Sequence, residues 1–291
     1  MLIAALRRLR HGPLKRLNVL WLLLGQAWRW SSRRLGDAIT VRHRIGRYGP
    51  FRLDGFFAFS NFAQWGSNHN EGFAACIEAC RGRRCVMDVG AHIGLVTLPM
   101  ASVIDPGGRV VAFEPSGINR AYLERHIALN GFTDRVSVEA ALVGERESEG
   151  IPFFELDEAA GQNTTIAGVL PPGTPRSMIA QVSLDQYCAK TGLSPEVIKI
   201  DVEGAEIDVL RGAQKTLTEL RPVVFLSVHP RQIQAAGRSL EELNAVISSV
   251  GYDCRHTDGS PVSAFALREY VLRPAVISLP LTPRECQANE C

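Results

Sequence analysis

Short β-rich runs alternate with helical patterns from residue 85 onward, and this alternation constrains the fold more than any other feature of the sequence. An alternation of this kind is typical of a mostly parallel sheet covered by helices. The sequence therefore predicts an α/β fold. The expected strands are residues 85–89, 109–113, 136–141, 197–202 and 223–228, and the expected helices are residues 95–102, 117–130 and 205–217. A capping box at 239–242 opens a further helix that Gly251 ends, and residues 252–255 and 269–277 should supply the last, antiparallel strands.

Residues 145–180 interrupt this rhythm, because prolines and glycines are frequent there. Long loops inside compact domains are often functional lids, and we expect this insertion to lie over the site. The predicted organisation is a basic N-terminal extension at 1–50, a catalytic domain at 51–280 that contains the insertion, and a C-terminal tail at 281–291.

The charge is distributed unevenly, although the net charge of the chain is only +2. Residues 1–50 contain eleven Lys or Arg and one acidic residue, which gives +10, and the remainder carries −8. A basic tail on an acidic body indicates contact of the tail with phosphates or anionic lipid, and argues against a catalytic face that binds nucleic acid.

The apolar stretch at residues 19–24 is too short to span a membrane. Two interpretations stay open for residues 1–35: an interfacial helix on a membrane surface, or a helix packed on the core. The seven cysteines form an odd set without a C-x-x-C pair, which favours free thiols in a reducing compartment over disulfides or a zinc site. We therefore expect a cytoplasmic protein, peripheral to the inner face of the membrane under the first interpretation.

The most informative motif is the strand-to-turn segment at residues 88–94, with the sequence DVGAHIG. A strand that runs into glycines lets the backbone approach a ligand closely, while N–H groups of the next helix point toward it. The dinucleotide pattern G-x-G-x-x-G is absent, because His92 stands where its middle glycine would be. An acidic strand end such as Asp88 suits the ammonium group of a methionine moiety. We expect Asp88, Gly90, His92 and Gly94 to bind the cofactor.

Glu114 follows the next predicted strand directly. A carboxylate in this place can accept hydrogen bonds from both ribose hydroxyls of an adenosine, whichever cofactor carries it. A glycine turn together with an acid at the neighbouring strand end predicts an adenosine site. The alternative is a surface glutamate beside Pro115.

Residues 198–206, IKIDVEGAE, place charges in an otherwise apolar core strand. On an extended strand Lys199, Asp201 and Glu203 would point to one side. Buried charges are unfavourable unless they are paired or used, and open α/β sheets bind ligands at the carboxyl ends of their strands. We therefore predict a functional role for all three residues. An ion pair of Lys199 with Asp201 or Glu206 is the structural alternative.

Seven separated blocks, in the right order over residues 85–232, resemble the FkbM family of methyltransferases. These blocks are residues 88–94 (DVGAHIG), 113–115 (FEP), 130–131 (NG), 183–185 (SLD), 198–206 (IKIDVEGAE), 210–212 (LRG) and 229–230 (HP).

The resemblance implies the class I methyltransferase fold, a Rossmann-like domain whose mostly parallel seven-stranded sheet has helices on both faces. It implies a methyl transfer from S-adenosylmethionine to a hydroxyl of a sugar, glycan or secondary metabolite, so the expected partners are that cofactor and a small-molecule or glycan acceptor. Asp88, Gly90 and Gly94 would line the methionine end, and Glu114 would hold the ribose.

Two positions depart from the family pattern. His92 stands where asparagine is frequent, and Ser227 stands where glutamate is frequent. If that glutamate assists catalysis in other members, its role is lost or relocated here.

Methyl transfer to an aliphatic hydroxyl requires a base near the transition state. Asp201 and His229 are the candidates, and Lys199 and Glu203 complete the predicted catalytic set. Asp201 is also expected to bind the cofactor. A structural histidine before Pro230 is the alternative for His229. Some O-methyltransferases use a divalent metal, and Asp201 and Glu203 are possible ligands for one, but two carboxylates are too few to predict a metal site.

Two other classes of function are compatible with such a fold. An NAD-dependent enzyme of Rossmann type would share the glycine turn and the distal acid, but it would need the missing G-x-G-x-x-G. A non-catalytic binding module would retain the fold without the chemistry, and the intact Asp88, Glu114 and Asp201 argue against it.

Overall fold

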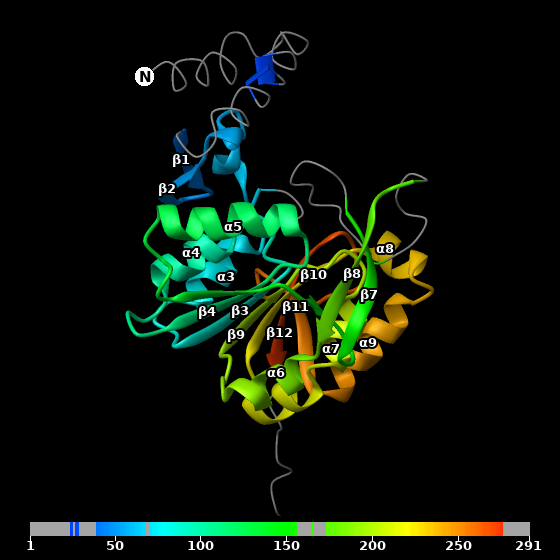
Figure 1. Ribbon diagram of the computed structural model, residues 1–291. Helices are drawn as coiled ribbons and strands as arrows, with labels where there is room; N and C mark the ends of the chain where they lie inside the picture. The colour runs from blue at the N-terminus through cyan, green and yellow to red at the C-terminus, as the bar shows by residue number, and fades with distance from the viewer. Residues whose placement is uncertain are drawn as a thin grey trace, which may run out of the picture.

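The computed structural model describes residues 39–67, 70–155 and 173–275, together with residues 24, 25, 27, 28 and 165 (Figure 1). A seven-stranded sheet forms its centre, with the strand order β11-β12-β10-β9-β3-β4-β5. The strands are β3 (Cys85–Val89), β4 (Arg109–Phe113), β5 (Val136–Glu139), β9 (Val197–Ile200), β10 (Val223–Val228), β11 (Tyr252–His256) and β12 (Arg268–Pro274).

The pairing within this sheet is parallel except at β12, which is antiparallel to both β10 and β11. Numbered along the chain, the seven strands lie across the sheet in the order 3-2-1-4-5-7-6. This topology confirms the predicted Rossmann-like class I methyltransferase fold. Of the two final strands, which we expected to be antiparallel, only β12 runs against the others; β11 runs in their direction.

Successive residues of the core strands enter different hydrophobic cores, one on each face of the sheet. Val86 belongs to one core and its neighbour Met87 to the other, because side chains alternate along a strand. Strands buried on both faces are continuous apolar runs, as the sequence showed. The first core contains α3 (Phe73–Ala79), α4 (Thr97–Val103) and α5 (Gly117–Leu129); the second contains α6 (Leu184–Thr191), α7 (Glu206–Arg211), α8 (Pro230–Ala235) and α9 (Leu240–Ser249).

The predicted helix at 205–217 is divided into α7 and a π-helical turn, η4 (Thr216–Leu220). The break follows Gly212, where the chain passes very close to the backbone of Gly144. A Cβ at Gly212 would lie 2.0 Å from the Gly144 carbonyl oxygen, so this approach requires glycine. A tertiary contact therefore ends α7 at a point that helical periodicity alone did not identify.

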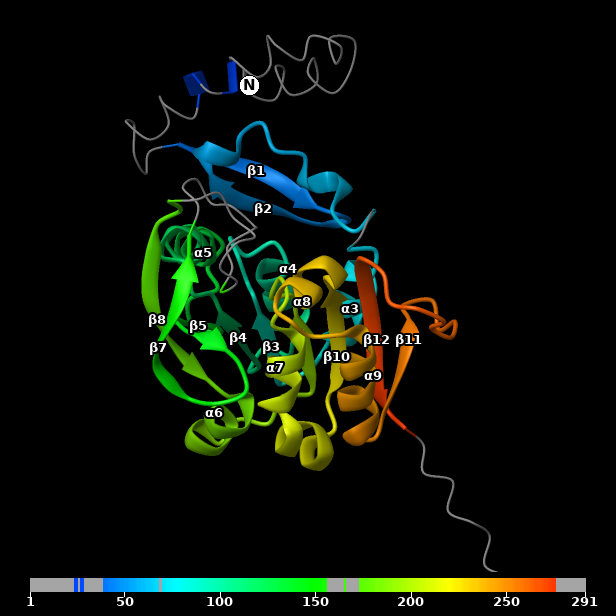
Figure 2. The same ribbon diagram turned by 90° about the vertical axis from the view of Figure 1, so that its right-hand side faces the viewer.

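An N-terminal hairpin, β1 (Thr40–Ile45) and β2 (Tyr48–Asp54), lies across the outer side of α5 and α4 (Figure 2). Its apolar residues, Val41 and Leu53 among them, are buried in the same core as α4 and α5. The turns η2 (Gly55–Phe57) and η3 (Phe62–Gln64) connect it to the rest of the chain. The hairpin crosses residue 50, the predicted domain boundary, so the packed domain begins upstream of that position.

The predicted insertion contributes most of a second, three-stranded sheet, ordered β6-β8-β7. β6 (Leu142–Val143) pairs in parallel with β8 (Arg176–Val182), and β7 (Ser148–Phe154) pairs with β8 in an antiparallel hairpin. Apart from Thr165, residues 156–172 lie outside the described residues.

Of the predicted extension at 1–50, the structure describes residues 24, 25, 27, 28 and 39–50, and the predicted tail at 281–291 lies outside the described residues. Trp28 is described: its Nε1 donates a hydrogen bond of 2.8 Å to the Gly55 carbonyl oxygen, and its ring packs against Phe59. This contact is what the packed interpretation predicts, whereas membrane contact stays a prediction. Among the described residues, we find no helix with the length and apolar character that crossing a bilayer requires.

Candidate active site

The glycine turn after β3 is built by backbone conformations that a side chain would prevent. Gly90 and Gly94 have φ values of +88° and +93°. A Cβ at Gly90 would lie 1.9 Å from the Asp201 carbonyl oxygen, so the turn is in direct contact with the segment after β9. His92 between them has a φ of 51°, an uncommon value for a residue with a side chain. The predicted motif therefore forms the tight corner that its glycines indicated.

Glu114 follows β4 and is fixed by three hydrogen bonds. The His92 N–H donates to Oε2 at 2.7 Å, the Ser116 N–H donates to Oε1 at 2.9 Å, and Asn119 Nδ2 donates to Oε1 at 3.4 Å. Burial raises the pKa of Glu114 to about 7 against the opposing effect of these donors. Since a carboxylate has about four acceptor positions, Glu114 retains the capacity to accept hydrogen bonds from a ligand.

Asp88, the acidic residue of β3, lies behind the turn. Its side chain is buried, and its Oδ2 accepts a hydrogen bond of 2.6 Å from Thr97 Oγ1 at the start of α4. Burial raises the pKa of Asp88 to about 6. This contact ties the turn to the helix that follows it, and direct contact of Asp88 with a cofactor stays a prediction.

A cavity of about 630 Å³, partly open to solvent, lies at the carboxyl ends of β3, β4 and β9. Among the predicted site residues, Gly90, His92, Glu114, Asp201 and Glu203 line it, and Asp88, Gly94, Lys199 and His229 do not. Its apolar wall is formed by Phe113, Leu142, Val143 and Phe153.

The insertion reaches this cavity. Phe153 of β7 and Thr165 both line it, so the insertion lies beside the site as expected. Its movement as a lid stays a prediction.

Lys199 is buried in the sheet and does not open into the cavity. Its Nζ lies 3.0 Å from Glu269 Oε1, and it donates hydrogen bonds to Ser227 Oγ at 2.6 Å and to Asp201 Oδ2 at 3.3 Å. Burial acts to lower the pKa of Lys199, but the carboxylates of Asp201 and Glu269 outweigh it and raise that pKa. Lys199 therefore stays charged, which suits the positioning of Asp201 and not the acceptance of a proton.

The side-by-side arrangement expected for Lys199, Asp201 and Glu203 was wrong in one respect. β9 ends at Ile200, and Glu203 has a φ of 52°, so the chain has already turned where Glu203 leaves it. The period of two along a strand does not extend to Glu203. Lys199 and Asp201 do meet, as the structural alternative for Lys199 required.

Ser227 and Glu269 are register partners on β10 and β12. Both contact Lys199. A carboxylate is thus present opposite position 227, on the neighbouring strand, whereas in the family pattern glutamate is frequent at 227 itself. The structure places the carboxylate at Glu269, which is 1 % exposed.

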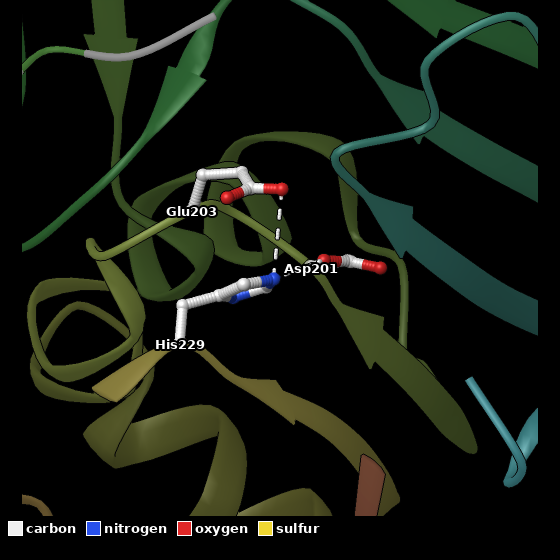
Figure 3. A group of neighbouring side chains, drawn as sticks. All are labelled: Asp201, Glu203 and His229. Atoms are coloured by element: carbon white, nitrogen blue, oxygen red, sulfur yellow. Dashed lines mark ion pairs between the residues drawn. The ribbon is translucent and has the colours of Figure 1, made fainter. Parts of the chain in front are cut away.

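His229 directly follows β10, and its side chain lies beside the two carboxylates that follow β9, so that the three form one cluster (Figure 3). Its Nε2 lies 3.6 Å from Asp201 Oδ1 and 3.5 Å from Glu203 Oε1. Its Nδ1 donates a hydrogen bond of 2.7 Å to Glu206 Oε1, and this carboxylate oxygen also accepts a bond from the Gly204 N–H. We call Asp201, Glu203 and His229 the acid cluster.

The electrostatics of the acid cluster reflect its crowded carboxylates. Burial acts to lower the pKa of His229, but the hydrogen bond to Glu206 and the charges of Asp201 and Glu203 raise it to about 8. Burial acts to raise the pKa of Asp201, but Lys199 and His229 outweigh it and lower that pKa. Asp201 is therefore ionised at neutral pH.

Sequence reasoning missed several residues of the site. Glu206 lies within the recognised motif, but nothing in its spacing showed that it would hold His229. Glu269 is far along the chain and carries no motif. The apolar wall also went unnoticed, although the position of Phe113 directly before Glu114 was a usable signal.

Two curated relatives are similar to this chain over about 200 residues. The AMB antimetabolite synthetase AmbE of Pseudomonas aeruginosa is 29% identical over 203 residues, which cover 58% of this chain and 9% of that protein. The methyltransferase sdnD of Sordaria araneosa is 27% identical over 199 residues, which cover 58% of this chain and 73% of that protein. The chain therefore spans only a small part of the first relative and most of the second.

Solved structures with a comparable arrangement include a methyltransferase FkbM from Methylobacillus flagellatus KT, with 22% identity, a TM-score of 0.44, and coverage of 66% of this chain and 44% of that chain. The O-methyltransferase TomG from Streptomyces achromogenes, solved in complex with SAM, has 13% identity, a TM-score of 0.41, and coverage of 70% and 79%. The model of the methyltransferase FkbM domain matches residues 88–254, more than half of the sequence. The protein belongs to the FkbM methyltransferase domain family.

Proposed function

We propose that this protein transfers the methyl group of S-adenosylmethionine to a hydroxyl oxygen of a sugar, glycan or secondary metabolite. One observation carries the proposal: Gly90 and His92 of the glycine corner, Glu114, and the two carboxylates of the acid cluster line one cavity at the carboxyl ends of adjacent parallel strands. Open α/β sheets bind their ligands at this edge.

The residues around the cavity fit an adenosyl sulfonium donor. Gly90 lets the turn pack directly against the Asp201 backbone, and the His92 N–H of the same turn donates to Glu114, which fixes the carboxylate at the cavity. Glu114 would accept hydrogen bonds from the ribose hydroxyls, and Phe113, Val143 and Phe153 offer apolar surface for an adenine ring. His92, where a dinucleotide site has glycine, makes this corner less suited to a pyrophosphate.

The acid cluster supports an oxygen acceptor. Asp201 and Glu203 line the cavity, and they would orient a hydroxyl in line with the methyl group and receive its proton together with His229. S-adenosylmethionine supplies an electrophilic methyl carbon, so that a C–O bond forms while the C–S bond breaks and its electron pair stays on sulfur. The products are a methyl ether, S-adenosylhomocysteine and the proton held by the protein.

Calorimetry with S-adenosylhomocysteine tests donor binding. We expect the full-length protein to bind this product and not NAD. Glu114→Ala should weaken binding about 10- to 100-fold, since a charged hydrogen bond contributes about 1.5–3 kcal/mol. Glu124→Gln, on the exposed face of α5, is the matched control and should bind like the wild type. Folded protein without affinity for the product would overturn the proposal, and binding of NAD would establish the oxidoreductase alternative.

Methyl transfer from a labelled donor into an extract of the host cells tests the acceptor side. We expect a labelled product with the wild type, and a loss of about 100-fold or more with Asp201→Asn and with His229→Ala, since positioned bases contribute about 10²–10⁴-fold. If both variants transfer methyl groups within about twofold of the wild-type rate, the base lies elsewhere.

A further inference from the structure

Three potential metal ligands converge in the acid cluster from two strand ends (Figure 3). Asp201 and Glu203 follow β9, and His229 follows β10. One ligand atom from each lies within 4.8 Å of the other two. Sequence alone offered two neighbouring carboxylates, which are too few for a metal site; the fold adds a nitrogen donor from 26 positions beyond Glu203.

His229 gives independent support, because its ring is fixed from behind. It is 4 % exposed, and its Nδ1 donates to Glu206, which is fully buried. A hydrogen bond of this kind, from one ring nitrogen to a carboxylate, orients metal-binding histidines and leaves the other nitrogen as a ligand. Among the described residues, that other nitrogen, Nε2, has no closer polar partners than Asp201 and Glu203.

The separations within the cluster suit a shared ion better than direct bonds. Nε2 lies 3.5 and 3.6 Å from the two carboxylate oxygens, beyond the about 2.7–3.2 Å of a good hydrogen bond. Two ligand atoms that each lie about 2.0–2.2 Å from one ion are separated by roughly 3–3.7 Å at ordinary coordination angles. Gln232 Nε2 donates to the second oxygen of Glu203 at 3.0 Å, which leaves Oε1 facing His229.

Charge also favours a cation. The carboxylates of Asp201, Glu203 and Glu206 surround one imidazole. Lys199 contacts Asp201, but it is shared with Glu269. Asp201 and Glu203 line the cavity, so an ion beside them would keep coordination positions open to water or to an acceptor.

We propose that Asp201, Glu203 and His229 bind a divalent cation at the edge of the cavity. Two carboxylates with one imidazole favour Mn²⁺ or a similar transition metal over Mg²⁺ and Ca²⁺, which prefer oxygen ligands alone. Glu206 is a positioning residue, because it touches the ring of His229 and not the ion. The cation would bind the acceptor hydroxyl and lower its pKa, which eases the proton transfer that the proposed function assigns to the acid cluster; this role rests on the proposed function, whereas metal binding does not.

Mn²⁺ binding to the full-length, EDTA-treated protein tests the site by electron paramagnetic resonance, in which the signal of free Mn²⁺ disappears on binding. We expect one Mn²⁺ per chain in the wild type. Asp201→Asn, Glu203→Gln and His229→Gln should each weaken binding at least about tenfold, and Glu206→Gln about 10- to 100-fold. Glu219→Gln removes an exposed carboxylate in η4, before β10 and so away from the strand end that carries His229, and should bind like the wild type.

Two results would overturn the metal site. One is the absence of Mn²⁺ binding by wild-type protein that still binds S-adenosylhomocysteine, which shows that the fold and donor site are intact. The other is Mn²⁺ binding that the three ligand variants leave unchanged while circular dichroism shows them folded. Specific Mn²⁺ binding without affinity for S-adenosylhomocysteine would instead support the metal site and reject the proposed methyl transfer.

Discussion

Lys199 carries its charge in the middle of an apolar sheet, and the residues around it explain how that charge is tolerated. Glu269, Ser227 and Asp201 come from three different segments and all contact its ammonium group. The stability of a buried ion pair falls strongly when one partner is removed, because the other charge then stays buried without compensation. The same contacts hold Asp201 at the edge of the cavity, so Lys199 positions a residue of the proposed acceptor site while it stabilises the sheet.

Glu269→Gln should therefore lower the free energy of unfolding by about 3 kcal/mol, since it removes one of the two carboxylates that compensate a buried charge. Urea unfolding measures this change. Glu71→Gln is the matched control: Glu71 pairs with Arg268, the residue next to Glu269, but at the surface, where an ion pair contributes about 1 kcal/mol or less. Equal and small effects of the two substitutions would contradict the role assigned to Glu269.

At the scale of elements, one buried histidine joins the N-terminal hairpin to the helical layer. His126 on α5 accepts a hydrogen bond from the Asp54 N–H at Nε2, 3.0 Å away, and donates from Nδ1 to the Ile93 carbonyl oxygen at 2.8 Å. Both bonds require the neutral ring with its proton on Nδ1. Burial lowers the pKa of His126 to about 4.

This shift predicts a loss of stability in acid. The folded-state pKa of His126 lies below its ordinary value of 6.5, so its contribution is complete above that value and is lost as the pH falls toward 4. Between about pH 7 and pH 5 the wild type should lose about 2 kcal/mol relative to His126→Gln, which cannot titrate. Glu114 and Asp88, whose pKa values burial raises, act in the opposite direction in this window.

Because those two acids are present in both proteins, urea unfolding at the two pH values isolates the contribution of His126. If the wild type and His126→Gln show the same pH dependence, His126 is not the titrating link between the hairpin and α5.

At the scale of the whole molecule, the sequence predicted those features that depend on local pattern. Residues 85–89 and 109–113 are short β-rich runs, and this pattern placed the first two core strands at their observed bounds. The glycine corner and Glu114 were found because each directly follows such a strand. The predictions were less accurate where a distant contact decides the outcome, as at Gly212, where the backbone of Gly144 ends a helix.

In the acid cluster, too, the residues were predicted from local motifs, whereas their contacts depend on distant parts of the chain. Asp201 and Glu203 were identified from one motif, and His229 from another. Strand order brings these three residues together and places Glu206 beside the ring of His229. The antiparallel pairing of β12 with β10 places Glu269 opposite Ser227. The sequence does not show which strand ends become neighbours in the sheet. His229 was therefore identified as the third ligand of the proposed metal site only from the folded structure.

The missing side chain at Gly90 has a mechanical consequence. The Asp201 carbonyl occupies the space in which a Cβ would lie, so the glycine corner and the segment after β9 are in direct backbone contact. The β7–β8 hairpin borders the same cavity through Phe153, so under the proposed function it can be reshaped for a different acceptor while the contact between Gly90 and Asp201 is kept.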